Sequence, residues 1–251
     1  MTVKYITKIS DCKNAANVLR ACDEIAFDIE GVNHGRHGRL SLIQACGRNT
    51  DIYLFHITAL GKAAFGEGGL KTLLEGSTIK VVFDPRNDAD ALHYLYGVSL
   101  KNAYDLQIMH AFKFSLFSDR FVKGLGKAFQ DFTGVTKKER ERLDAIKEKG
   151  LDLFAVERGG RGEVWEDEPL PKELIDYASC DVKYLLDMKQ AWGGRRYDAT
   201  VLKTTAERIK KAIKRRVALE GRERAKRDFF IPESMGKTPA VRRSYNNFSC
   251  R

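Results

Sequence analysis

Two acidic residues stand at the end of an otherwise apolar segment near the N-terminus. Residues 24–32 read EIAFDIEGV, with Asp28 and Glu30 two positions apart. Because the side chains of a β-strand alternate between its two faces, both carboxylates point to the same side. Neighbouring carboxylates repel each other, and removing them from water costs free energy. The pair therefore indicates either a bound cation that compensates both charges or a solvated strand end.

Two later segments supply further oxygen ligands for such a cation. Asp88 lies in the first turns of a helix predicted after the apolar strand 78–83, near the strand end where ligands bind in α/β sheets. Tyr177 and Asp181 are four residues apart in a predicted helix, so they share one helical face. Four converging carboxylates favour Mg²⁺ or Mn²⁺. Two such ions about 4 Å apart can activate a water molecule and stabilise the leaving oxygen of a phosphodiester.

The apolar patterns predict an α/β domain around these residues. Antiparallel strands with glycine-rich turns come first and strand–helix alternation follows, which indicates a mixed β-sheet flanked by helices. The expected strands are 24–30, 39–46, 51–55, 78–83 and 98–105. The expected helices are 10–22, 68–75, 86–95, 105–114, 121–130, 136–149 and 171–190, with a polar link over 157–170.

The net charge of +10 is concentrated in the C-terminal fifth of the chain. Residues 201–251 hold 15 basic and 5 acidic side chains, which accounts for the whole excess. We predict a basic helix over 198–227 that carries Lys210, Lys211 and Lys214. This helix fits binding to a nucleic-acid backbone, and it fits equally well a helix packed on the domain with a solvated outer face. The segments expected are thus a domain over 1–197, a basic helical extension over 198–231 and an irregular tail over 232–251.

The motifs resemble the DEDD 3′–5′ exonucleases in their tyrosine-containing, ribonuclease D-like form. The three motifs are FDIE at 27–30, the Asp88 helix after KVVF, and Tyr177-x-x-x-Asp181. Supporting stretches are LSLIQ (40–44), NAYDLQI (102–108) and RFVKGLGKAF (120–129). The resemblance covers about residues 5–195 and is greatest to eukaryotic exonuclease-domain proteins related to Egalitarian and the small-RNA exonucleases. It implies an RNase H-like fold. One departure is Glu168, where many relatives have arginine.

The resemblance also implies a role for each site residue. Asp28, Glu30 and Asp181 would hold one metal ion, and Asp28 and Asp88 would hold the second. Tyr177 would orient the attacking water, and its ordinary pKa near 10 favours a hydrogen bond over full base catalysis. The implied reaction is hydrolysis of nucleic acid from its 3′ end, which releases nucleoside 5′-monophosphates, with RNA favoured over DNA.

Further residues are candidates for contact with the substrate. His37 and Arg36 lie in a glycine-rich loop after the acids, where a solvated turn is an equal alternative. The segment 120–129 supplies possible phosphate contacts and possible contacts with terminal bases. The former are Arg120, Lys123 and Lys127, and the latter are Phe121 and Leu125.

Other classes of protein are disfavoured. The chain has no apolar run of membrane-spanning length and no apolar N-terminal signal, and its five cysteines form no CxxC pair. We therefore expect an intracellular protein without a zinc site. The alternatives are a catalytically weak RNA-binding scaffold of a small-RNA or RNA-processing pathway, a nuclease that cuts internally, and a small-nucleotide hydrolase. Targeting could come from a protein partner.

Overall fold

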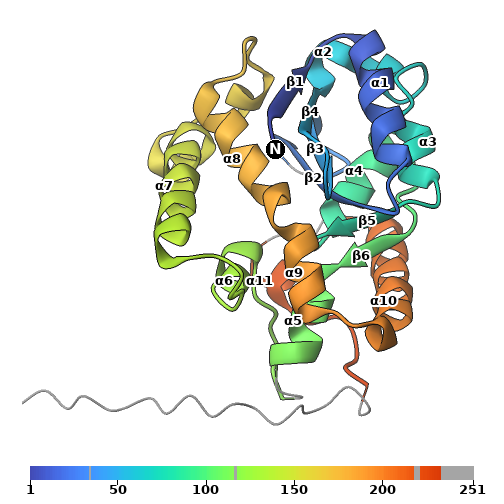
Figure 1. The fold of residues 1–251 in the computed structure, drawn as a ribbon, viewed down its shortest axis with the longest axis vertical. Coiled ribbons are helices and arrows are strands. Elements are labelled where there is room, and N and C mark those ends of the chain that lie inside the picture. The colour runs from blue at the N-terminus through green and yellow to red at the C-terminus, as the bar shows by residue number, and fades with distance from the viewer. Residues whose placement is uncertain (34, 116–117, 218–220, 233–251) are drawn as a thin grey trace, which may run out of the picture.

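The computed structural model describes residues 1–33, 35–115, 118–217 and 221–232 (Figure 1). Its centre is a six-stranded mixed sheet in the order β1-β4-β3-β2-β5-β6. The strands are β1 (Val3–Ile6), β2 (Glu24–Val32), β3 (Arg39–Gly47), β4 (Ile52–His56), β5 (Ile79–Val82) and β6 (Ala103–Asp105). Strand β3 is antiparallel to β2 and β4, whereas the other three pairings are parallel. The predicted mixed α/β sheet is confirmed.

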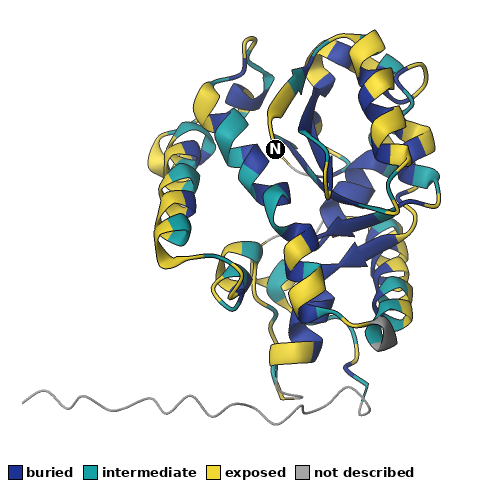
Figure 2. Ribbon diagram, viewed as in Figure 1, coloured by how far each residue is buried: buried dark blue, intermediate teal, exposed yellow. Residues whose placement is uncertain are grey.

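Helices cover both faces of this sheet, so that the strands other than the edge strand β1 are almost wholly buried (Figure 2). One face carries α1 (Ile9–Arg20), α2 (Ile57–Leu60), the 3₁₀ turn η1 (Gly61–Ala64), α3 (Leu70–Glu75) and α4 (Arg86–Tyr96). The other carries α5 (Leu106–Phe114), α6 (Leu125–Phe129), α7 (Lys137–Phe154), the 3₁₀ turns η2 (Val156–Arg158) and η3 (Gly162–Glu166), α8 (Lys172–Lys183) and α9 (Leu185–Trp192). Helix α10 (Arg195–Lys214) packs along α4, α5 and β6, and α11 (Gly221–Ala225) follows it.

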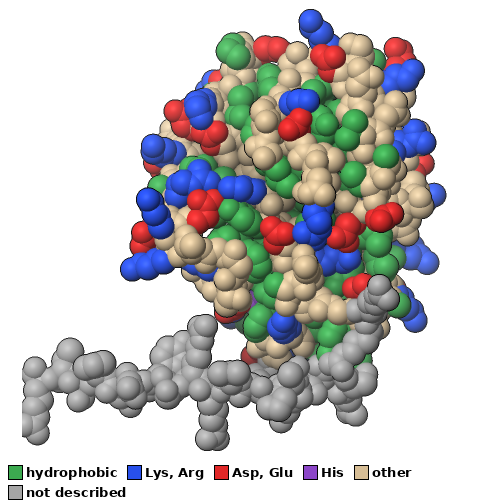
Figure 3. All heavy atoms as spheres, viewed as in Figure 1, with side chains coloured by type: hydrophobic (Ala, Val, Ile, Leu, Met, Phe, Trp, Pro, Cys, Tyr) green, Lys and Arg blue, Asp and Glu red, His purple; other side chains and the backbone are tan. Residues whose placement is uncertain are grey.

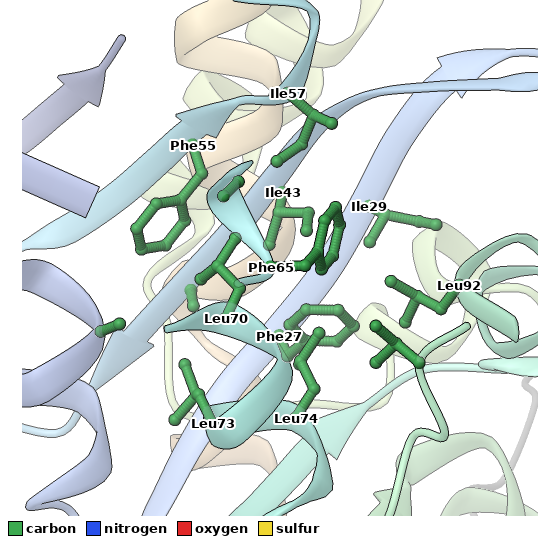
Figure 4. Close-up of a cluster of buried hydrophobic side chains, with 14 of the residues drawn as sticks. Phe27, Ile29, Ile43, Phe55, Ile57, Phe65, Leu70, Leu73, Leu74 and Leu92 are labelled. Carbon is green, nitrogen blue, oxygen red and sulfur yellow. The ribbon is translucent and has the colours of Figure 1, made fainter. Parts of the chain in front are cut away.

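Strand β2 separates an apolar core from the acidic residues. Phe27 and Ile29 point into the core beneath α3 and α4, where they lie among Phe65, Leu74 and Leu92 (Figure 4). Fully burying each such side chain contributes roughly 1.5–3 kcal/mol. Ala26 belongs to the core on the opposite face. The alternation of the strand therefore directs Asp28 and Glu30 to the α8 side, as their spacing predicted.

Four predicted helices and one predicted strand differ from the structure. The predicted helix 136–149 continues to Phe154 as α7, and the predicted strand 98–105 is confined to β6. The predicted helix 121–130 is confined to α6, and 171–190 is divided at Tyr184 into α8 and α9. The predicted helix 198–227 ends at Lys214, because Arg215 has an extended backbone with ψ near 152°. Arg36 and Tyr94 donate hydrogen bonds to the last helical carbonyls, at 3.1 and 2.9 Å from Ile213 O. These donors satisfy helix-end carbonyls that would otherwise remain unpaired.

The basic C-terminal extension is integrated into the fold. The predicted boundary at residue 197 lies inside α10, whose Val201, Thr205 and Arg208 are buried against the body. Strand β1 and the short helix α2 were not anticipated. The predicted tail beyond Pro232 lies outside the described residues. Among the described residues, no helix combines the length and the apolar character needed to cross a bilayer.

A buried ionic network attaches α10 to the rest of the domain. The Arg208 side chain is 2% exposed; it pairs with Asp105, donates to Gln107 at 2.9 Å and donates to Asp228 at 2.8 Å. Asp105 also accepts a hydrogen bond from Gln107 N and so begins α5, as expected of a helix N-cap. Arg208 thus joins α10, the start of α5 and the segment after α11.

Replacement of Arg208 by methionine should lower the free energy of unfolding by about 3–5 kcal/mol, because Asp105 would stay buried without its partner. Urea denaturation followed by circular dichroism measures this change. The matched variant Lys210→Met alters an exposed residue of the same helix and should shift stability by less than about 0.5 kcal/mol. Equal effects of the two substitutions would show that the Arg208 network contributes no stability.

Candidate active site

Five acidic side chains line one cleft of about 370 Å³, and four of them come from three helices and strands. Asp28 and Glu30 come from β2, Asp88 from the first turn of α4, and Asp181 from α8. Carboxylate oxygens of Asp28, Glu30 and Asp181 all lie within 4.8 Å of one another. Asp88 also lines the cleft but does not belong to this group of three. The cleft therefore brings together the four acids that the sequence selected.

A β-bulge positions the acids at the end of β2. The register with β3 shifts between Glu30 and Gly31. A Cβ atom at Gly31 would lie 2.0 Å from the carbonyl oxygen of Arg39, so only glycine allows this approach of the two strands. Bulges bend a strand and redirect its side chains. Gly31 is therefore part of the local structure that aims Glu30 into the cleft.

Asp84, the fifth acidic residue that lines the cleft, is engaged in ion pairs. Its carboxylate accepts hydrogen bonds from Arg86, at 2.6 and 3.0 Å, and from Arg224 at 3.0 Å. These partners hold the pKa of Asp84 below its ordinary value, against the opposing effect of burial. We infer that Asp84 fixes the β5–α4 connection, which leaves Asp88 as the acid that α4 contributes to the cleft.

Tyr177 is held by tight packing between α7 and α8. A Cβ atom at Gly150 would lie only 2.5 Å from Cδ2 of Tyr177 and 2.8 Å from its Cβ, so the ring rests against the α7 backbone. Phe154 and Trp165 make edge contacts with the ring at centroid distances of 5.3 and 6.0 Å. Lys147 Nζ lies 3.4 Å from the ring centroid and pairs with Asp181.

Burial and mutual repulsion set the protonation of the site. Burial, followed by the charges of Asp88, Asp181 and Glu30, raises the pKa of Asp28 well above its ordinary value, although Lys147 lowers it. Burial likewise raises the pKa of Asp181 to about 6. Burial and the nearby carboxylates also raise the pKa of Tyr177. The phenol therefore keeps its proton, so it remains able to donate a hydrogen bond.

This donor set fits hard divalent cations. The ligands are carboxylate oxygens, partly buried and close enough to repel one another, and a divalent ion would offset that repulsion. Asp28, Glu30 and Asp181 are the residues that could hold one ion. Asp88 lines the cleft beside Asp28 and could contribute to a second.

Only part of the predicted substrate-binding set reaches the cleft. Leu125 lines it. Arg120 and Phe121 line an adjoining hollow, and Lys123 pairs with Asp131 at 2.6 Å. Lys127 is exposed on α6. The remaining candidates lie elsewhere among the described residues: His37 is exposed on the β2–β3 loop, and Lys210, Lys211 and Lys214 are exposed on α10.

Arg36 has a structural role that the sequence did not reveal. Its guanidinium donates to both carboxylate oxygens of Asp90, at 3.2 and 2.7 Å, and lies 4.1 Å from the Tyr94 ring centroid. The same group caps the end of α10. We infer that Arg36 joins the β2–β3 loop to α4 and α10 and is not available to the substrate.

Two cations beside the acids were not predicted. Arg224 of α11 lines the cleft, whereas Lys147 of α7 lines a neighbouring hollow and pairs with Asp181 from there. Arg224 stands beside Asp84 and Asp88; although burial lowers its pKa, these carboxylates raise it by more. The sequence signal for both was a basic residue in an amphipathic helix, which ordinary solvated faces share.

An RNase H-like sheet with an acid-lined cleft at the end of its central strand defines a domain of the 3′–5′ exonuclease class. A family model described as 3′-5′ exonuclease matches residues 3–192, and the chain belongs to this family. A mouse protein named piRNA biogenesis protein EXD1 is 31% identical over 166 residues, which are 64% of this chain and 27% of the mouse protein. The human protein of that name is 30% identical over 163 residues, or 64% and 30% of the two chains. This chain thus spans less than a third of these mammalian relatives.

Solved structures share the fold. RNase D of Trypanosoma brucei, in a complex with GMP, is 25% identical with a TM-score of 0.72 over 88% of this chain and 67% of that chain. The same enzyme in a complex with RNA U12 has a TM-score of 0.74 at 23% identity, over 90% and 76% of the two chains. The RNase D-like fold expected from the motifs is confirmed.

Replacement of Gly150 by alanine should destabilise the domain and displace the Tyr177 ring. Helix propensity favours alanine by about 1 kcal/mol, whereas overpacking against Tyr177 Cβ and Cδ2 costs about 1–3 kcal/mol. Urea denaturation and a crystal structure of the variant measure both effects. Gly126→Ala is the control, because its Cβ meets no atom within 4 Å and should cause no loss. An unmoved Tyr177 with unchanged stability would contradict the packing described above.

The stability of the metal-free protein should fall as pH rises from 4 to 7. The folded state keeps the Asp181 proton up to a pKa of about 6, whereas the unfolded chain loses it near 4, so the folded state binds more protons in this range. Asp181 then accounts for up to about 3 kcal/mol of lost unfolding free energy, so Asp181→Asn should make the decline shallower, while Asp28, whose pKa is also raised, maintains the remainder. Urea denaturation in EDTA across this range tests it. Asp176→Asn, on the same helix, should keep the parental profile, and an undiminished decline in Asp181→Asn would refute the assignment.

Proposed function

We propose that this protein hydrolyses phosphodiester bonds one at a time from the 3′ end of nucleic acid, with RNA preferred over DNA, and releases nucleoside 5′-monophosphates. The observation that carries the proposal is the convergence of Asp28, Glu30, Asp88 and Asp181 with Tyr177 in one cleft. Membership of the 3′–5′ exonuclease family supports it.

Each acid of the cleft and Tyr177 would have a separate role in catalysis. Asp28, Glu30 and Asp181 would hold one divalent ion, Mg²⁺ or Mn²⁺, and Asp28 and Asp88 the other. Such ions, when bound, supply an activated water and neutralise charge on the phosphodiester. Tyr177, fixed by Gly150, Phe154 and Trp165, would orient the water through its protonated hydroxyl.

Apolar residues of the cleft would position the terminal nucleotide. Ile29, Phe83, Leu125 and Leu185 line the cleft beside the acids. Their side chains offer contacts for a base or sugar while the carboxylates face the reacting phosphate. Contact with apolar groups is tolerant of base identity, so we expect little sequence preference at the 3′ end.

The preference for RNA is supported by the relatives. The mammalian relatives are named for piRNA biogenesis, and the trypanosomal RNase D structure contains RNA. Because this chain spans less than a third of the mammalian proteins, its substrate is proposed separately from theirs. We also propose that a partner protein directs it to particular RNAs.

The principal alternative is an RNA-binding scaffold with a weak active site. The presence of all four acids and the tyrosine in one cleft favours catalysis over this reading. Products separate the remaining rivals. An exonuclease gives a ladder that shortens from the 3′ end, an endonuclease gives internal fragments, and a small-nucleotide hydrolase acts on dinucleotides alone.

The decisive test is a time course on matched 5′-labelled single-stranded RNA and DNA with Mg²⁺, Mn²⁺ or EDTA. The parent should give a metal-dependent ladder from the 3′ end, faster on RNA. Asp28→Asn should reduce the rate about 10³-fold or more, because metal ligation supplies several kcal/mol of transition-state stabilisation. Asp176→Asn should cleave at the parental rate.

Two outcomes would overturn the proposal. Cleavage that persists in purified Asp28→Asn would reject the site. Binding of RNA without cleavage under either metal would favour the scaffold. Faster hydrolysis of DNA would reverse the substrate preference and leave the chemistry intact.

A further inference from the structure

After α10 the chain returns to the cleft, where residues 225–227 pair with residues 120–122. Val122 N donates to Ala225 O at 2.9 Å, and Arg227 N donates to Arg120 O at 2.9 Å. Phe121 and Lys226 form an antiparallel bridge between these two hydrogen bonds. We call residues 120–122 with 225–227 the ribbon.

Buried charges anchor the ribbon. Arg86 donates to the carbonyl oxygen of Arg224 at 2.5 Å, and Arg224 Nε donates to Asp84 at 3.0 Å. Beyond the ribbon, Asp228 pairs with Arg86 at 3.2 Å and with Arg208 at 2.8 Å. The position of the ribbon is therefore fixed by the same ionic groups that support the base of α4 and Asp88.

The ribbon stands between two hollows. Val122, Arg224 and Ala225 line the acidic cleft. Arg120, Phe121 and Lys226 line a second hollow, together with Arg222 and Arg227. Adjacent residues of the same two segments thus line both the cleft and the second hollow. A nucleic-acid strand that leaves the cleft across the ribbon enters the second hollow directly.

The second hollow has the chemistry of a single-strand binding surface. Four cations (Arg120, Arg222, Lys226 and Arg227) face two acids (Asp119 and Glu223), and Lys226 pairs with Glu223 at 2.5 Å. The local excess is therefore positive. On the face drawn in Figure 3, by comparison, basic and acidic side chains are interleaved. Binding of a polyanion requires such a local excess, because interleaved charges largely cancel.

An aromatic side chain stands within this basic group. Phe121 is 41% exposed, although it is large and apolar. The Arg222 guanidinium lies 5.3 Å from its ring centroid. Exposed aromatic rings flanked by arginine stack with bases, and each stacked base contributes about 1–3 kcal/mol. Phe121 with Arg222 therefore offers a stacking platform one step from the cleft.

We propose that the ribbon and its hollow bind the single-stranded nucleic acid upstream of the 3′-terminal nucleotide, with Arg222 and Lys226 on phosphates and Phe121 on a base. This inference rests on the proposed function, because it places the 3′ end in the acidic cleft. The basic C-terminal region thereby contributes to substrate binding through α11 and the ribbon. The lysines of α10 line neither the cleft nor the second hollow.

The test measures binding separately from cleavage. Arg222→Glu/Lys226→Glu is introduced into the Asp28→Asn protein, and fluorescence anisotropy follows a 5′-labelled 20-nucleotide RNA and a 3-nucleotide RNA. The double variant should weaken binding of the 20-mer at least tenfold and leave the trimer unchanged. The slope of log affinity against log salt should fall by about 1.4, the value for two lost phosphate contacts on a single strand. Phe121→Ala should weaken binding of the 20-mer by about 5- to 150-fold.

The control is Lys13→Glu/Lys62→Glu, which makes the same charge change at exposed positions of α1 and η1. If this control weakened binding of the 20-mer equally, net charge alone would explain the loss and the proposal would be overturned. Parental affinity of the double variant for the 20-mer would also overturn it. Equal loss of the trimer and the 20-mer would place the residues in the cleft itself and also overturn it. Failure of the parent to cleave RNA, with ribbon-dependent binding retained, would reject the proposed catalysis and uphold the ribbon.

Discussion

Repulsion among desolvated carboxylates at the end of β2 is the constraint on which the surrounding structure depends. Asp28, Glu30 and Asp181 stand within 4.8 Å of one another, with Asp88 in the same cleft. The opposite face of β2 compensates for this cost, because Phe27 and Ile29 are buried in the apolar core. Lys147 pairs with Asp181 on one side, and Arg224 stands near Asp88 on the other. The domain thus concentrates negative charge where cations, protein-borne or bound, can balance it.

The main features of the fold and the acidic set could be predicted because they follow short-range rules. The period of two in β2 fixed the shared face of Asp28 and Glu30, and the spacing of four did the same for Tyr177 and Asp181. The core strands were long and apolar enough to be recognised. Strand β1 and helix α2 have only four residues each, too few for a periodic pattern to develop.

The remainder depended on tertiary packing that no local pattern encodes. Arg36 looked like a loop cation, yet the loop folds onto α4 and α10, where Asp90 and helix-end carbonyls receive the guanidinium. The long basic helix expected near the C-terminus stops at Lys214, where Arg36 and Tyr94 cap it, and the chain turns back toward the cleft. Lys147 and Arg224 also reach the site through tertiary contacts: α7 packs on α8, and the segment of Arg224 is held by Arg86, Asp84 and residues 120–122.

The pairing of residues 120–122 with 225–227 has a consequence for synthesis of the protein. A ribosome makes β2, α4 and α8, and therefore all four acids, before it makes α11 and the returning segment. The nascent chain can assemble the sheet early, since domains fold as their residues emerge. The wall formed by Val122, Arg224 and Ala225 nevertheless stays open until residue 227 has left the ribosome. Completion of this cleft therefore follows the synthesis of residue 227, after all four acids have been made.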